Sequence, residues 1–296
     1  MAEERIPLIE TVDLKKYFKV GDKSFLHAVD GINMKVYAGE TIGVVGESGC
    51  GKSTLGRTIL RLIEPTSGQI LYNGDDITKY NTRQMKKMRQ ELQIIFQDPY
   101  ASLDPRKSVI EIIAEYMIIN KTLPKKREIF NRAAHLMDVV GLARRYATAY
   151  PHELDGGRRQ RIGIARALSV NPKFIVCDEP VSALDVSIQA QILNLLMDLQ
   201  DDMGLTYMFV THDLSVVKHI SDNIMVMYLG QCLELTSSDE LFAKPVHPYT
   251  QALLSAIPEP DISMRNKEIK VIKGEVVSPV AVSYTHLRAH ETDQYL

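Results

Sequence analysis

The stretch GESGCGKST at residues 46–54 fits the pattern G-x-x-x-x-G-K-[ST] of a phosphate-binding loop. A predicted strand at residues 41–45 precedes it and a predicted helix at residues 52–62 follows it, as this loop requires. The glycines let backbone N–H groups turn inward around a phosphate, and the N-terminus of the helix adds its dipole. We expect a nucleotide to bind along the whole loop, at Gly46, Glu47, Ser48, Gly49, Cys50, Gly51, Lys52, Ser53 and Thr54.

Two side chains of this loop have specific expected roles. Lys52 is predicted to reach the β and γ phosphates of ATP, and the Ser53 hydroxyl to ligate Mg²⁺. ATP and Mg²⁺ are therefore the expected cofactors. The alternative is an ordinary glycine turn, which the flanking strand and helix make a weaker interpretation.

A second motif is the run FIVCDE at residues 174–179, which is apolar and ends in two acids. This form is typical of a strand whose carboxylates emerge beside bound phosphates. Asp178 is predicted to hold Mg²⁺ through its water shell, and Glu179 to orient and polarise the attacking water. The alternative is an acid pair that caps a helix after a core strand.

A histidine follows the next predicted strand, in the run VTHD at residues 210–213. His212 then lies at the carboxyl end of a buried strand, the usual edge for ligand contacts in such sheets. We expect it to bond the γ phosphate, while a capping or loop histidine is the alternative.

The remaining pattern predicts an α/β fold with a mixed, mainly parallel sheet covered by helices on both faces, and an antiparallel β part near the N-terminus. Strands are expected at residues 8–12, 32–36, 41–45, 69–71, 92–96, 173–177, 206–211, 223–228 and 231–235. Residues 97–170 show only helical spacing and are predicted to form an inserted helical subdomain. The nucleotide-binding core is then residues 1–96 and 171–243, followed by a C-terminal extension at 244–280.

Composition narrows the class of protein. Lys and Arg number 35 and Asp and Glu 37, so the net charge of −2 provides no basic field for nucleic acid. The N-terminal MAEERIPLIE lacks the features of a secretory signal, and three widely spaced cysteines suit a reducing compartment. Because no apolar run approaches the roughly 20 residues of a membrane span, we expect a cytoplasmic protein that reaches a membrane through a partner.

Six elements in this order resemble the ABC ATPase family, a group of P-loop NTPases: the phosphate loop, FQDP at 96–99, LDGGRRQR at 154–161, FIVCDE, SALD at 182–185, and His212. The resemblance covers about residues 5–280. It implies that Gln97 touches Mg²⁺, senses the γ phosphate, and hinges the helical subdomain that docks on membrane subunits. It also suggests Phe18 as the aromatic residue that stacks on adenine, with Tyr17, or a purely structural aromatic, as alternatives.

The resemblance further implies a head-to-tail pair of ATPase subunits. Each ATP lies between the phosphate loop of one subunit and the signature motif of the other, here Asp155, Gly156 and Gly157. The loop that contains Asp185 then runs along the dimer interface.

Three local runs look like the dipeptide and oligopeptide importer ATPases, which also serve some nickel importers: PYASLDPR at 99–106, PVSALDVS at 180–187 and HPYTQALL at 247–254. This resemblance implies a second, homologous ATPase subunit, two permease subunits and an extracytoplasmic solute-binding protein. The chain would be peripheral, at the cytoplasmic face of the plasma (inner) membrane. The alternative functions are those of a soluble ABC-type ATPase acting on ribosomes or nucleic acid, and of a P-loop kinase.

The chain departs from the family at two places. The signature reads LDGGR instead of LSGGQ, so Asp155 can only accept hydrogen bonds and brings like charge toward phosphate unless Arg158 neutralises it. Residues 282–292 match the translation of a transposon-type sequencing adapter. We therefore predict that the extension is truncated near residue 280 and that 281–296 is a non-native read-through tail, in which His286 and His290 are not metal ligands.

Overall fold

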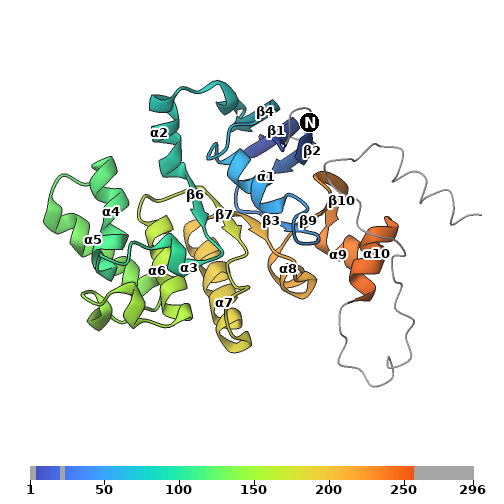
Figure 1. Ribbon diagram of the computed structural model, residues 1–296. Coiled ribbons are helices and arrows are strands. Elements are labelled where there is room, and N and C mark those ends of the chain that lie inside the picture. Colours follow the sequence, from blue (N-terminus) through green and yellow to red (C-terminus); the bar gives the residue numbers. More distant parts are fainter. Residues whose placement is uncertain (1–4, 21–23, 257–296) are drawn as a thin grey trace, which may run out of the picture.

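The computed structural model describes residues 5–20 and 24–256, and within these it contains two sheets flanked by helices (Figure 1). The smaller sheet is antiparallel, in the order β2 (Phe25–Val36), β1 (Ile9–Lys19), β4 (Ser67–Tyr72) and β5 (Asp75–Asp76). The larger sheet has the order β10 (Gln231–Ser237), β9 (Asn223–Tyr228), β3 (Thr41–Val45), β8 (Thr206–Val210), β7 (Phe174–Asp178) and β6 (Leu92–Ile95). Its strands are parallel except β10, so the predicted mixed α/β fold is confirmed.

The central strands of the larger sheet are apolar along their whole length because both of their faces are covered. Every residue of β3, β7 and β8 is buried. On β7, Phe174 and Val176 face a cluster that includes helix α1 (Lys52–Ile59), while Ile175 and Cys177 pack in the cluster that contains α7 (Val186–Met203). The sheet is thus an inner layer, and its carboxyl ends carry the polar motifs.

Helix α1 lies between the two sheets, where it contacts β1 and β2 on one side and β7 and β8 on the other. Gly56 allows this close packing, because a Cβ atom there would lie 2.7 Å from Cγ1 of Val176. The helix ends three residues earlier than we predicted. Arg61, at φ 53°, adopts the left-handed conformation of a Schellman end, in which Leu62 N–H donates to Arg57 O and Arg61 N–H to Thr58 O.

Residues 97–170 are helical in the structure, as predicted, and form the lobe at the left of Figure 1. Its elements are α3 (Pro99–Ser102), α4 (Val109–Asn120), α5 (Lys126–Val139), η2 (Arg144–Tyr146), η3 (Pro151–Glu153) and α6 (Gly156–Leu168). The apolar residues of this lobe join one core cluster with α7 and with one face of β7 and β8. The lobe therefore packs directly on the sheet, and its exact boundaries stay a prediction.

The other helices are η1 (Ile77–Lys79), α2 (Thr82–Glu91), α8 (Leu214–Ile220), α9 (Ser238–Ala243) and α10 (Pro248–Ser255), of which α8 packs on the central strand β3. Strands β1 and β2 are longer than predicted, because register shifts and the positive φ of Asp13 interrupt the apolar alternation of β1. None of the helices in the described part of the chain is both long and apolar enough to cross a membrane. The predicted extension beyond residue 256 and the tail at 281–296 lie outside the described residues.

Candidate nucleotide site

The phosphate loop connects the end of β3 to the start of α1 and is closely packed from two sides. A Cβ atom on Gly46 would lie 2.1 Å from the carbonyl oxygen of Met227, and one on Gly51 would lie 1.9 Å from that of Ala28. Both glycines also have positive φ, at 148° and 108°. Since no side chain fits at either position, the two glycines let the loop bend between β9 and β2.

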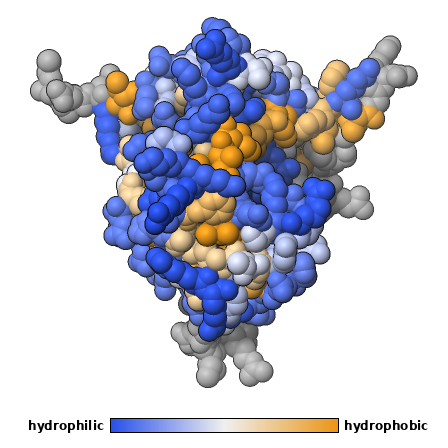
Figure 2. All heavy atoms as spheres, turned by 90° about the vertical axis from the view of Figure 1, so that its left-hand side faces the viewer, coloured by the Kyte–Doolittle hydropathy of each residue, from blue (hydrophilic) through white to orange (hydrophobic). Residues whose placement is uncertain are grey.

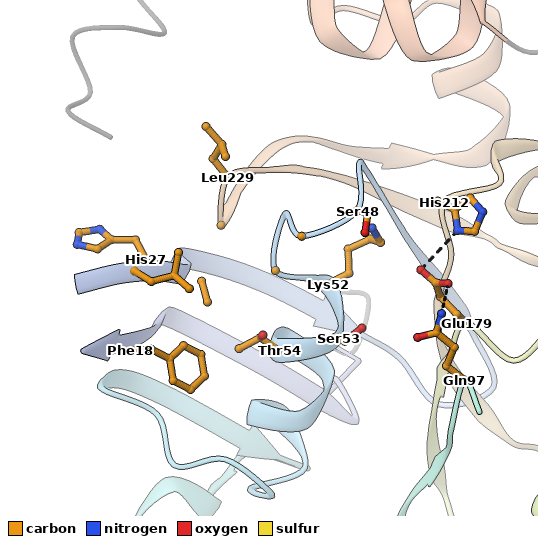
Figure 3. Close-up of a pocket in the computed structure, with 15 residues that line it drawn as sticks. Phe18, His27, Ser48, Lys52, Ser53, Thr54, Gln97, Glu179, His212 and Leu229 are labelled. Carbon is orange, nitrogen blue, oxygen red and sulfur yellow. Dashed lines mark hydrogen bonds and ion pairs between the residues drawn. The ribbon is translucent and has the colours of Figure 1, made fainter. Parts of the chain in front are cut away.

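A cavity of about 470 Å³ opens along this loop (Figure 3). Phe18 lies at one end of the cavity, the loop with Lys52 lies in the middle, and Glu179 and His212 lie at the other end (Figure 3). The loop residues that line it are Ser48, Gly49, Gly51, Lys52, Ser53 and Thr54. Gly46, Glu47 and Cys50 belong to the loop but do not line the cavity.

The Lys52 ammonium is held inside the loop. Its side chain is only 4% exposed, and Nζ donates to the carbonyl oxygens of Gly46 at 2.7 Å and Glu47 at 2.8 Å. Burial raises the pKa of the neighbouring Cys50 thiol above its ordinary value, although Lys52 opposes this shift. Cys50 therefore stays neutral, and Lys52 supplies the positive charge of the loop.

Two of the three predicted metal-binding side chains, Ser53 and Asp178, are in direct contact, while the third, Gln97, donates to Glu179. The Ser53 hydroxyl donates to Oδ1 of Asp178 at 2.6 Å, and Nη2 of Arg57 lies 3.2 Å from Oδ2 of the same carboxylate. Asp178 is 1% exposed. Hydroxyl and carboxylate oxygens are the hard ligands that Mg²⁺ prefers, so these residues fit the expected ion.

Glu179 connects the ends of three strands. Its Oε2 accepts a hydrogen bond from Nε2 of Gln97 at 2.8 Å, and its Oε1 lies 3.4 Å from Nδ1 of His212 (Figure 3). Gln97 follows β6, Glu179 follows β7 and His212 follows β8. Three residues that the sequence separates widely thus form one group at the carboxyl edge of the sheet.

Glu179 also has an unusual backbone conformation, with φ at 47°, and its N–H donates to the carbonyl oxygen of Val210 at 2.9 Å. A non-glycine residue in the left-handed region carries strain that the surrounding structure must offset, and such strain clusters at functional sites.

The aromatic end of the cavity distinguishes the two candidates for adenine. Phe18 lines the cavity, and Nζ of Lys16 lies 4.9 Å from its ring centroid. Tyr17 does not line it, because its hydroxyl donates to Asp30 and its ring stacks on His27 with centroids 4.0 Å apart. The geometry favours Phe18.

The signature residues Asp155, Gly156 and Gly157 lie away from this cavity, at the start of α6. Oδ1 of Asp155 caps the helix by accepting from Arg158 N–H at 2.8 Å, and Oδ2 pairs with the Arg158 guanidinium. That guanidinium lies 5.0 Å from the ring centroid of Tyr146. Arg158 therefore does face the Asp155 charge, which was one of the two possibilities that the sequence left open.

The signature also lies beside the predicted interface loop. A Cβ atom on Gly156 would lie 3.0 Å from Cδ2 of Leu184, and one on Gly157 would lie 2.7 Å from Cγ2 of Ile188. Asp185 lies between these two neighbours in the sequence, directly before α7. The signature and the Asp185 loop thus form one continuous surface.

Sequence reasoning missed Arg57 and the cavity residues from β2 and the β9–β10 turn, namely Leu26, His27, Ala28, Leu229 and Gly230. Arg57 could have been found, because it follows Ser53 by one helical turn and must lie on the same face. The strand and turn residues carry no local signal, since only the tertiary fold brings them to the loop.

Residues 29–182 match the sequence model of the ABC transporter family, and residues 233–283 match that of the oligopeptide/dipeptide transporter C-terminal region. The chain is 52% identical to the oligopeptide transport ATP-binding protein OppF of Bacillus subtilis over 264 residues, which cover 89% of this chain and 86% of that protein. It is 48% identical to the dipeptide transport ATP-binding protein DppF of Escherichia coli over 279 residues, which cover 93% and 83%. Among solved structures it resembles the dimeric ATP-binding cassette MJ0796 bound to ADP and Pi, with a TM-score of 0.71, 28% identity, and coverage of 78% of this chain and 98% of that one.

Proposed function

This chain belongs to the ABC transporter ATPases, in the branch of the oligopeptide and dipeptide transport ATP-binding proteins, and we propose that it hydrolyses MgATP between Phe18 and Glu179 to power peptide import. The observation that carries the proposal is the placement of the Glu179 carboxylate at the far end of a cavity whose middle is the Lys52 loop. A carboxylate in this place can polarise a water molecule that attacks the terminal phosphate.

Each part of the cavity has a separate role in this proposal. Phe18 stacks on the adenine, and Lys52 with the loop N–H groups binds the β and γ phosphates. Ser53 and Asp178 would hold Mg²⁺, which would neutralise phosphate charge when bound. Glu179 takes up the proton of the attacking water, while Gln97 and His212 orient its two oxygens.

The subunit works, we propose, with a second homologous ATPase, two permease subunits and an extracytoplasmic peptide-binding protein, as a peripheral protein at the cytoplasmic face of the plasma membrane. The relatives are ATP-binding proteins of oligopeptide and dipeptide transport, which supports a role for this chain as one component of a transporter. Figure 2 views the side on which α4 and α5 lie and shows apolar surface between hydrophilic side chains. The large exposed apolar residues of the helical lobe, Tyr100, Ile118, Ile119 and Tyr150, would suit contact with a permease.

The function is tested by co-expressing the chain with permease subunits and a partner ATPase from the same source DNA, and by measuring ATP turnover in vesicles. We expect Mg²⁺-dependent hydrolysis that rises when a peptide-loaded binding protein is added, and that stops when EDTA removes the metal. Stimulation by Ni²⁺ in place of peptide would instead assign the chain to a nickel importer. ATP turnover that is stimulated by ribosomes or nucleic acid, and not by permeases, would contradict the transport function.

The Asp155 signature predicts that the two ATP sites of the pair are unequal. In a head-to-tail dimer Asp155 faces the ATP held by the partner, and its charge opposes phosphate even though Arg158 offsets part of it. We expect Asp155→Ser to speed the partner's site by about fivefold, which corresponds to about 1 kcal/mol for a screened surface charge. The measurement is the rate of a single round of phosphate release by a transporter that also carries Glu179→Gln, in which only the partner's site can hydrolyse its ATP.

Asp155→Asn is the matched variant for this prediction, because asparagine removes the charge and keeps the helix cap. Both substitutions should raise turnover if charge is the obstacle. No gain from either one, together with equal loss when the catalytic glutamate of either subunit is removed, would show that the two sites are equivalent.

A further inference from the structure

One contact to the phosphate loop comes from a residue outside the nucleotide-binding motifs. Tyr249 is the second residue of α10, in the HPYT run, and its hydroxyl accepts a hydrogen bond from the backbone N–H of Glu47 at 3.2 Å. The two residues lie 202 positions apart in the sequence. The C-terminal segment therefore reaches back to the loop that carries Lys52.

Glu47 is the point at which this contact can influence nucleotide binding. Its carbonyl oxygen accepts from Nζ of Lys52 at 2.8 Å and from Cys50 N–H at 3.3 Å. Glu47 itself is exposed, as are Ser48 and Gly49 after it, so these three residues form an outer turn of the loop. Tyr249 holds the N–H side of this turn while Lys52 holds its carbonyl side.

The tyrosine is itself firmly fixed. It is 6% exposed, its ring centroid lies 4.8 Å from that of Tyr228, and it packs in the cluster that contains Val45 at the end of β3. Burial raises the pKa of Tyr249 far above its ordinary value, so the hydroxyl remains neutral. The side chain thus presents an uncharged acceptor at a constant position.

The start of α10 is anchored to β10 by a second set of hydrogen bonds. The Glu234 carboxylate accepts from the N–H groups of Val246 at 3.0 Å and His247 at 3.1 Å. His247 in turn caps the helix, because its Nδ1 accepts from Tyr249 N–H at 3.1 Å. The place of Tyr249 is therefore set by the β10 strand and the HPYT run together.

We propose that Tyr249 is a positioning residue for ATP binding, which fixes the outer turn of the phosphate loop and makes nucleotide affinity depend on the C-terminal segment at residues 245–255. The inference rests on the proposed assignment of residues 46–54 as the ATP-binding loop. It adds a structural reason for the HPYT run to accompany this phosphate loop.

The test is Tyr249→Phe in the full chain, which removes the hydroxyl and keeps the ring. We expect the Kd for ATP, measured by titration, to rise about three- to tenfold, as the loss of one neutral hydrogen bond implies. In the assembled transporter KM should rise by a similar factor, while kcat stays within about twofold of wild type. A rise in KM with nearly unchanged kcat would distinguish the loss of loop positioning from a general loss of structure.

Tyr207→Phe is the matched control, since it also deletes a buried tyrosine hydroxyl, which donates to the carbonyl oxygen of Leu196 at 3.0 Å in the core. It should lower the melting temperature without changing the Kd for ATP. If Tyr249→Phe lowered the melting temperature in the same way but left the Kd within about twofold of wild type, the positioning role would be wrong. Failure of the wild-type chain to bind ATP would instead overturn the loop assignment itself.

Discussion

Replacing Glu179 with glutamine is expected to stop ATP turnover and leave ATP binding intact. Glutamine keeps the size of the side chain, and its amide oxygen can still accept the 2.8 Å hydrogen bond from Gln97. It cannot take a proton from water, and loss of a general base typically costs about 100- to 10,000-fold in rate. The measurement is phosphate release by the assembled transporter, compared with equilibrium binding of ATP to the same variant.

Slow turnover with undiminished binding should also trap the ATP-bound pair of subunits, which size-exclusion chromatography would detect. Glu128→Gln is the matched control, because it makes the same change in α5, at a side chain that is 42% exposed. It should hydrolyse ATP at the wild-type rate. Turnover of Glu179→Gln within about twofold of wild type would mean that another group activates the water.

Replacing Lys52 with alanine is expected to weaken ATP binding itself. The substitution removes a charge-assisted contact to phosphate, and it also removes the bonds that tie the carbonyl oxygens of Gly46 and Glu47 together. Hydrogen bonds to charged groups are worth about 1.5–3 kcal/mol, so we expect the Kd for ATP to rise by at least about tenfold. Titration of the purified chain with ATP measures this directly.

Lys79→Ala provides the comparison for this prediction, because Lys79 is 80% exposed and pairs only with Asp76 among the described residues. Its removal changes the net charge equally but should leave the Kd for ATP unchanged. If Lys52→Ala and Lys79→Ala bound ATP with equal affinity, the assignment of residues 46–54 as the ATP-binding loop would be contradicted.

The parts of the site that the sequence predicted are those that follow local rules. Strand β3, the loop and the start of α1 lie where the pattern placed them, because glycine spacing and apolar periodicity encode them over a few residues. The end of α1 was predicted wrongly because Arg61, and not glycine, occupies the left-handed position. Its guanidinium bonds to the carbonyl oxygens of Ile77 and Thr78, at 2.5 and 2.6 Å, can offset the strain.

Contacts between segments that are distant in the sequence could not be predicted from local patterns. Nothing in the HPYT run indicates that Tyr249 meets Glu47, and only the packing of α10 against the end of β3 brings them together. The alternatives for adenine were also separated by the structure, since Tyr17 and Phe18 are neighbours with similar chemistry. Their hydrogen-bond and ring partners decide which one lines the cavity.

The missing side chain at Gly56 has a consequence for the proposed magnesium site. Gly56 lets α1 approach β7 so closely that Ser53 and Asp178, one on each element, stand 2.6 Å apart. The packing of the helix against the strand therefore sets the distance between the two oxygens. Such preorganisation places the entropic cost of assembling the ligands in the folding of the core and not in the binding step. A methyl group at this position would act at long range, because it would widen the gap between ligands that it never touches.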